Sequence, residues 1–235
     1  MPAIRLEHVA KSYKDGNYET VAIRNIDLTV EQGEFVFLVG SRGAGKSTLL
    51  DIITGSLKPD RGAVYLDDVD VTRLGRRQSE QVRSCIGQIG RHDTLDRMGT
   101  VYDNLSTVRK VGFFWTKKEL NQTLADKALG IVGMPDSGGA YPRDLSPSEF
   151  RRVQVAKAIL RSPAILIMDD FPGNMDEDTV WDMLHLLMEL NRRGTTLLLA
   201  TNSSYVVNVM RRRVVTLADG RIVGDVQKGR YGYIG

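Results

Sequence analysis

Short apolar runs bounded by polar or glycine-rich turns predict β-strands in the first and last thirds of the chain. Near the start they cover residues 4–9, 22–30, 34–39 and 62–66, with a polar turn at 14–17. The runs at 165–168 and 196–201 are typical of parallel strands in a buried sheet. A final pair, at 214–217 and 221–226, is joined by an Asp219-Gly220 turn and predicts a hairpin.

The middle of the chain, from about residue 91 to 161, has helical periodicity instead. Helices are predicted at 117–132 and 148–160, and Thr116 followed by Glu119 forms the pattern of a capping box. Another helix, at 178–192, separates two strands and ends at Gly194. This order predicts one α/β domain over residues 1–235: a doubly wound core with an N-terminal antiparallel β-subdomain and an inserted helical subdomain at about 91–161.

The strongest chemical signal is the phosphate-loop pattern G-x-x-x-x-G-K-[ST], which is matched at every fixed position between the strand at 34–39 and a helix predicted at 48–53. In this context backbone N–H groups and the helix dipole hold a phosphate. Lys46 is expected to reach the β- and γ-phosphates of a nucleoside triphosphate, and the Ser47 hydroxyl to bind Mg²⁺. The alternative is a glycine-rich turn without a ligand. The residues predicted to bind the nucleotide are Gly40, Ser41, Arg42, Gly43, Ala44, Gly45, Lys46, Ser47 and Thr48.

Two carboxylates, Asp169 and Asp170, follow the apolar strand at 165–168. A buried parallel strand that brings an aspartate to the carboxyl edge of the sheet, beside the phosphate loop, is expected to hold Mg²⁺ from the second side. We assign this metal role to Asp169. The alternative is that the two acids cap a helix or form a turn.

Composition excludes several other classes of protein. Cys85 is the only cysteine, so neither an internal disulfide nor a cysteine metal cluster can form, which suits a reducing compartment. The net charge of +3, from 32 basic and 29 acidic residues, is too small to indicate a nucleic-acid partner. The apolar runs are too short to cross a bilayer, so any membrane role is expected to come through a partner.

Five features resemble, in order and spacing, those of ABC-type ATPase subunits, and the likeness covers essentially the whole chain. They are Tyr13, the phosphate loop, the segment 145–153, the strand ending in Asp169-Asp170 and the turn at 171–176. Residues 34–49, 100–104, 191–196 and 228–233 are similar in more detail to the FtsE family of cell-division ABC ATPases.

The resemblance implies a P-loop NTPase core of the ABC type that binds ATP with Mg²⁺, stacks Tyr13 on the adenine and hydrolyses ATP to ADP and phosphate. It further implies a cytoplasmic subunit, peripheral at the inner face of the cell membrane. Such a subunit forms a homodimer when ATP is bound and pairs with an FtsX-like membrane subunit to control cell-wall hydrolases during division.

Three positions predicted to be catalytic depart from the ABC pattern. Arg91 aligns with a glutamine that faces Mg²⁺ and the attacking water, Asp170 with the catalytic glutamate, and Asn202 with a histidine that senses the γ-phosphate. A cation at position 91 disfavours the metal, the shorter aspartate misplaces the carboxylate, and an amide cannot carry a proton. These changes predict slow turnover.

The fourth departure is in the signature segment, where Leu-Ser-Gly-Gly-Gln becomes Leu145-Ser146-Pro147-Ser148-Glu149. In the family this segment, including the serine equivalent to Ser146, clamps the γ-phosphate held by the opposing subunit. Pro147 has no N–H to donate and Glu149 adds negative charge, so the anion site is weakened. The same residues form a capping box, with Ser146 as N-cap, Pro147 at the first helical position and Glu149 three residues after the cap.

Two aromatic features have alternative interpretations. Tyr13 could pack in the core at the end of a strand instead of stacking on adenine. The run 113–115, Phe-Phe-Trp, could form part of a groove for a helix of the membrane partner, or it could pack inward.

The function predicted from these residues is an ATP-driven switch on a membrane partner, with slow ATP hydrolysis. One alternative is a fully active ABC transporter ATPase that exports a substrate, in which Asp170 suffices as the base. Another is a catalytically silent nucleotide-binding scaffold. A P-loop kinase has little support, because no lid for a phosphate acceptor is evident.

Overall fold

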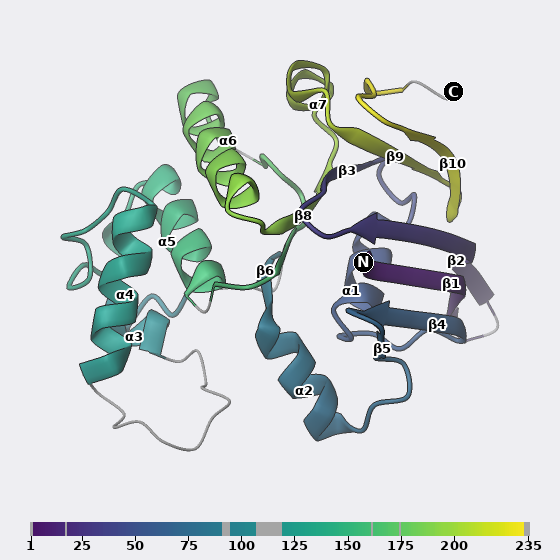
Figure 1. The fold of residues 1–235 in the computed structure, drawn as a ribbon, viewed down its shortest axis with the longest axis horizontal. Coiled ribbons are helices and arrows are strands. Elements are labelled where there is room, and N and C mark those ends of the chain that lie inside the picture. The colour runs from purple at the N-terminus through teal and green to yellow at the C-terminus, as the bar shows by residue number, and fades with distance from the viewer. Residues whose placement is uncertain are drawn as a thin grey trace.

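The chain is built around two β-sheets, of which the smaller is antiparallel (Figure 1). The computed structural model describes residues 2–16, 18–90, 95–106, 119–160, 162–173 and 175–232. The smaller sheet has the strand order β2-β1-β4-β5, and its long β1–β2 hairpin forms the predicted N-terminal antiparallel part. Its strands are β1 (Pro2–Asp15), β2 (Tyr18–Glu31), β4 (Arg61–Leu66) and β5 (Val69–Asp70).

The larger sheet has six strands in the order β10-β9-β3-β8-β7-β6, and only the pairing of β10 with β9 is antiparallel. Every residue of β3, β7 and β8 is buried, as expected of parallel strands covered on both faces. Successive side chains of β3 alternate between two hydrophobic clusters, with Phe37 in one and Leu38 in the other. The strands are β3 (Phe35–Val39), β6 (Ile86–Ile89), β7 (Ile165–Met168), β8 (Thr196–Thr201), β9 (Arg213–Ala218) and β10 (Arg221–Val226).

Helices cover both faces of this sheet. α1 contributes to the cluster shared with the antiparallel sheet, whereas α4, α5, α6 and α7 contribute to the cluster on the opposite face. The helices are α1 (Lys46–Ile53), α2 (Arg76–Cys85), α3 (Val101–Ser106), α4 (Glu119–Ile131), α5 (Pro147–Ile159), α6 (Glu177–Arg192) and α7 (Ser204–Met210), with a 3₁₀ turn at Pro142–Asp144.

Three of the helices, α3, α4 and α5, pack together within the region predicted to be helical. Figure 1 shows them on one side of the molecule and the antiparallel sheet on the other. The structure contains α4 and α5 close to the predicted limits, while Thr116, the proposed cap of the first, lies outside the described residues. Among the described residues, no helix is both long and apolar enough to cross a membrane.

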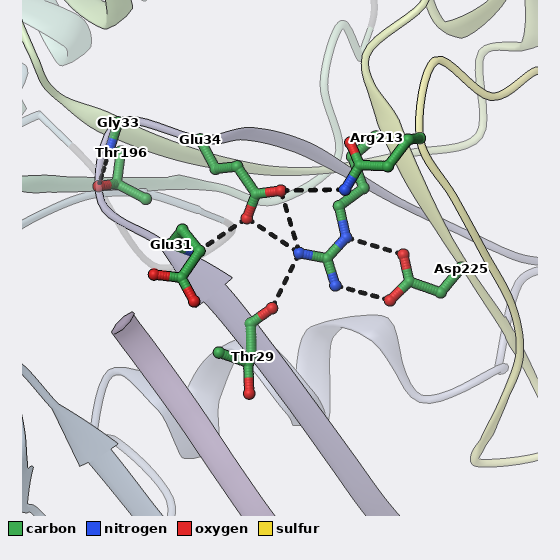
Figure 2. A network of polar contacts seen from close by, with 8 residues as sticks. Thr29, Glu31, Gly33, Glu34, Thr196, Arg213 and Asp225 are labelled. Carbon is green, nitrogen blue, oxygen red and sulfur yellow. Dashed lines mark hydrogen bonds and ion pairs between the residues drawn. The ribbon is translucent and has the colours of Figure 1, made fainter. Parts of the chain in front are cut away.

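A partly buried arginine joins the two sheets (Figure 2). The Arg213 guanidinium on β9 donates to both carboxylate oxygens of Asp225 on β10, at 2.7 and 2.6 Å. Its Nη1 also donates to Glu34 Oε2 at 2.9 Å and to the carbonyl oxygen of Thr29 on β2 at 2.8 Å. The hydrogen bonds to Asp225 raise the pKa of Arg213 above its usual value. One side chain therefore ties β2 to β9, β10 and the residue that precedes β3.

Candidate functional site

The loop between β3 and α1 has a shape that requires glycine at fixed positions. Gly40 and Gly45 have φ of 152° and 104°, in the region that side chains rarely adopt. A Cβ on Gly40 would lie 2.2 Å from the carbonyl oxygen of Leu217, and one on Gly45 would lie 2.6 Å from that of Ala22. Lys46 Nζ donates to the carbonyl oxygens of Gly40 and Ser41 at 2.7 and 3.0 Å, so the ammonium group curves back over the loop.

The N-terminus of α1 is open to an anion. Its N-cap is Gly45, no side chain caps it, and its first turn holds no acidic residue. The first N–H groups of a helix have no acceptor within the helix and carry its positive partial charge. Ser41, Arg42 and Gly43 are exposed next to this end. The loop therefore combines open N–H groups with the Lys46 ammonium, which suits a phosphate.

Ser47 and Asp169 line the same pocket, of about 130 Å³, between α1 and the carboxyl ends of β6 and β7. Two further polar residues line it, Asp51 and Gln88, which were not predicted. Hydroxyl, carboxylate and amide oxygens are the donors that Mg²⁺ prefers, so this set of residues fits the expected ion. Position in the sequence could have indicated Asp51, because it lies one helical turn after Ser47.

The two successive carboxylates lie in different pockets. Asp169 is half-buried in the pocket with Ser47, whereas Asp170 is exposed and has a positive φ of 61°. Asp170 lines a second pocket, of about 490 Å³, together with Pro147, Phe150 and Arg151 of α5. The expected catalytic carboxylate thus lies between the strand that carries it and the signature helix.

Asn202 lies at the same edge of the sheet as the phosphate loop. It follows β8 directly, and the last residue of β8, Thr201, is paired with Val39 at the end of β3. The Asn202 side chain is exposed. Parallel strands end at one edge, so this amide lies on the side where the nucleotide phosphates are expected.

Tyr13 lies beside the start of α1. Its hydroxyl is 3.3 Å from the Thr48 hydroxyl, and its side chain is 44% exposed and outside both hydrophobic clusters. The alternative that this ring packs in the core is therefore wrong. An exposed ring next to the phosphate loop is available for stacking on a base.

The N-terminus of α5 contains the predicted capping box. The backbone N–H of Ser146 donates to Glu149 Oε2 at 2.9 Å, its hydroxyl donates to the same oxygen at 2.8 Å, and Glu149 N–H donates to Ser146 Oγ at 3.3 Å. The hydrogen bond from the Ser146 backbone lowers the pKa of Glu149, and the bond from its hydroxyl lowers it further. Both the N–H and the hydroxyl of the signature serine, Ser146, thus donate to a carboxylate of the same chain.

Arg91 and the aromatic run 113–115, like Thr116, lie outside the described residues. The catalytic position of Arg91 and the two interpretations of the aromatic run stay predictions.

Comparison with known proteins gives one family. A family profile described as ABC transporter matches residues 23–171. The cell division ATP-binding protein FtsE of Streptococcus pneumoniae serotype 2 is 33% identical, over 99% of this chain and 99% of the relative. FtsE of Escherichia coli K12 is 36% identical, over 95% of this chain and 98% of the relative.

Among solved structures, an ATP-binding cassette determined as a dimer in a post-hydrolysis state with ADP and phosphate has a TM-score of 0.86 and 28% sequence identity. The match covers 97% of this chain and 100% of the cassette. These comparisons confirm the resemblance and the fold class that the sequence predicted.

Proposed function

The chain belongs to the ABC transporter family of ATP-binding proteins and is an ABC-type ATPase, and from this premise we propose that it is an ATP-driven switch with slow hydrolysis. The observation that carries this proposal is the contrast between two helix N-termini. The N-terminus of α1 is open beside the phosphate loop, whereas that of α5 is closed by Glu149. The first favours tight binding of nucleotide, and the second disfavours rapid turnover.

On binding ATP, Lys46 exchanges its two loop carbonyl oxygens for oxygens of the β- and γ-phosphates. The Ser47 hydroxyl and the Asp169 carboxylate would hold Mg²⁺, which would supply positive charge to neutralise the phosphates. Tyr13 stacks on the adenine. Hydrolysis needs a water that attacks the γ-phosphorus, and Asp170 accepts the proton of that water while ADP leaves.

The closed end of α5 explains why turnover is slow. In the proposed ATP-bound homodimer, the N-terminus of α5 meets the γ-phosphate held by the other subunit. Glu149 already accepts both donors of Ser146, and its negative charge repels the phosphate. Pro147 removes one further N–H donor. Each composite site combines one phosphate loop with the other subunit's α5, so both sites of a homodimer are affected.

The proposed partner is an FtsX-like membrane subunit, which would hold the ATPase at the inner face of the membrane and transmit its ATP cycle to cell-wall hydrolases. Support comes from the similarity to FtsE proteins, which extends over 95% or more of this chain. Co-expression with the membrane subunit encoded nearest to this protein, followed by purification in detergent, tests this part. Failure to co-purify would contradict it.

Nucleotide binding is tested by calorimetry on wild type and Lys46→Ala in the presence of Mg²⁺. Charge-assisted hydrogen bonds contribute about 1.5–3 kcal/mol each, so we expect the affinity for ATP to fall by at least about tenfold. Lys58→Ala, which removes an exposed lysine from the segment after α1, is the matched control and should bind as wild type does. Equal affinities of Lys46→Ala and wild type would contradict the assignment of Lys46 to the phosphates.

A further inference from the structure

Gln88 is the polar side chain of β6, and it faces the pocket that contains Ser47 and Asp169. In the sheet it is paired with Ile167 of β7, and side chains paired across parallel strands point to the same face. Ile167 and Asp169 are two residues apart, so they share that face as well. Gln88, Ile167 and Asp169 therefore all line the pocket on the α1 side of the sheet.

Gly90 leaves open the space between the Gln88 amide and Asp169. A Cβ built on Gly90 would lie 3.9 Å from Gln88 Nε2 and 3.9 Å from Asp169 Cβ. The Gln88 side chain thus extends toward the carboxyl edge of the sheet, and its amide and the Asp169 carboxylate flank one position that carries no side chain.

The opposite wall of the pocket comes from α1. Ser47 and Asp51, one helical turn apart, lie on the same side of this helix, and both line the pocket. Two carboxylates, a hydroxyl and an amide therefore surround about 130 Å³ of space next to the phosphate loop. This negative, oxygen-rich pocket suits a divalent cation that keeps part of its water shell, as Mg²⁺ does.

We propose that Gln88 is a metal-positioning residue, whose amide oxygen orients the Mg²⁺ that accompanies ATP or a water bound to that ion. The proposal rests on the proposed function and adds a residue to its metal site. The amide on β6 supplies, from inside the sheet, the kind of oxygen donor that Arg91 lacks. Because it is neutral, it orients the ion or its water without adding charge to a site that already contains two carboxylates.

The test measures how strongly Mg²⁺ enhances binding of a non-hydrolysable ATP analogue to the full chain, as the ratio of Kd in EDTA to Kd in Mg²⁺. Gln88→Met keeps the length of the side chain but removes the oxygen, and Gln88→Glu keeps an oxygen donor. Gln32→Met, in the exposed turn between β2 and β3, is the matched control. Loss of a group that orients a metal or its ligands costs about 10- to 100-fold in metal affinity, so the ratio should fall about tenfold in Gln88→Met.

Gln32→Met should keep the wild-type ratio, and the Kd of Gln88→Met in EDTA should equal that of wild type. Gln88→Glu should have at least the wild-type ratio, because it keeps an oxygen donor and its added charge attracts the ion. An unchanged ratio in Gln88→Met, an equal loss in Gln88→Glu, or a wild type without any Mg²⁺ effect would each overturn the role of Gln88. If Gln88→Met does not fold, Gln88→Ala is judged by the same criteria. A wild type that does not bind the analogue, or a Lys46→Ala variant that binds it equally, would instead overturn the proposed function.

Discussion

Among single residues, Glu149 has the clearest effect on the site, because it places a negative charge of the chain itself at the N-terminus of α5. Its carboxylate occupies the end of α5 where the family pattern expects a phosphate of the opposing subunit, and it accepts the N–H and the hydroxyl of Ser146. A serine N-cap normally leaves its hydroxyl hydrogen available, but here that hydrogen is donated to Glu149. In the proposed dimer, helix stability and γ-phosphate binding therefore compete for the same donors.

The hydrogen bonds that Ser146 donates to Glu149 predict a pH-dependent contribution of Glu149 to stability. The folded-state pKa of Glu149 is lowered, so its contribution is present above the unfolded-state pKa of about 4.3 and is lost as the pH falls through the lower folded value. Wild type should have a larger free energy of unfolding in urea than Glu149→Gln at pH 7, and the difference should shrink below about pH 4. A difference that stays constant on acidification would contradict this account.

Residue patterns predicted those parts of the site that depend on local sequence. The capping box of Ser146 and Glu149 is encoded within four residues, and the phosphate loop within eight, so both could be predicted. Asp51 could have been expected near Ser47 from its spacing along α1, but Gln88 could not be placed in their pocket, because its position there depends on how α1 packs over β6 and β7. The Gln88 amide lies next to Gly90, where a Cβ would be only 3.9 Å from its Nε2.

At the scale of elements, the sequence pattern was most informative for buried strands and least informative for polar elements. α2 (RRQSEQVRSC) was not predicted, because Val82 is its only strongly apolar residue besides Cys85. β1 and β2 were predicted only in part, because beyond Ala10 their paired residues are largely polar and extend as an exposed hairpin. Pairing between these strands, rather than burial, determines their length.

The link between the sheets depends on Arg213. Its side chain is only 11% exposed, and replacing it with methionine would leave Glu34 and Asp225 without their shared donor. Hydrogen bonds to charged groups contribute about 1.5–3 kcal/mol, so we expect Arg213→Met to lose about 2 kcal/mol in urea unfolding.

The control is Arg221→Met, which removes an exposed arginine from the neighbouring strand β10. Surface substitutions usually change stability by less than about 0.5 kcal/mol. If both variants lost the same free energy of unfolding, the network in Figure 2 would not be what stabilises the junction between the sheets.

At the scale of the whole molecule, the phosphate loop and the end of α5 belong to different parts of the fold. The loop lies between β3 and α1, whereas α5 packs with α3 and α4 in the helical part. In the proposed dimer the two parts meet only across subunits. A homodimer therefore has two sites of the same kind, each with an open phosphate loop and a closed signature helix.

Steady-state phosphate release shows whether the residues around the γ-phosphate keep turnover slow. We expect kcat to rise by at least about tenfold, equivalent to about 1.4 kcal/mol of barrier, in the combined variant Arg91→Gln, Asp170→Glu, Asn202→His, Pro147→Gly and Glu149→Gln. The single substitutions should have non-additive effects, since all act on one transition state. Lys46→Ala added to the combined variant should abolish the gain. A wild type that already releases phosphate at about ten per second, a typical enzyme rate, would contradict the account.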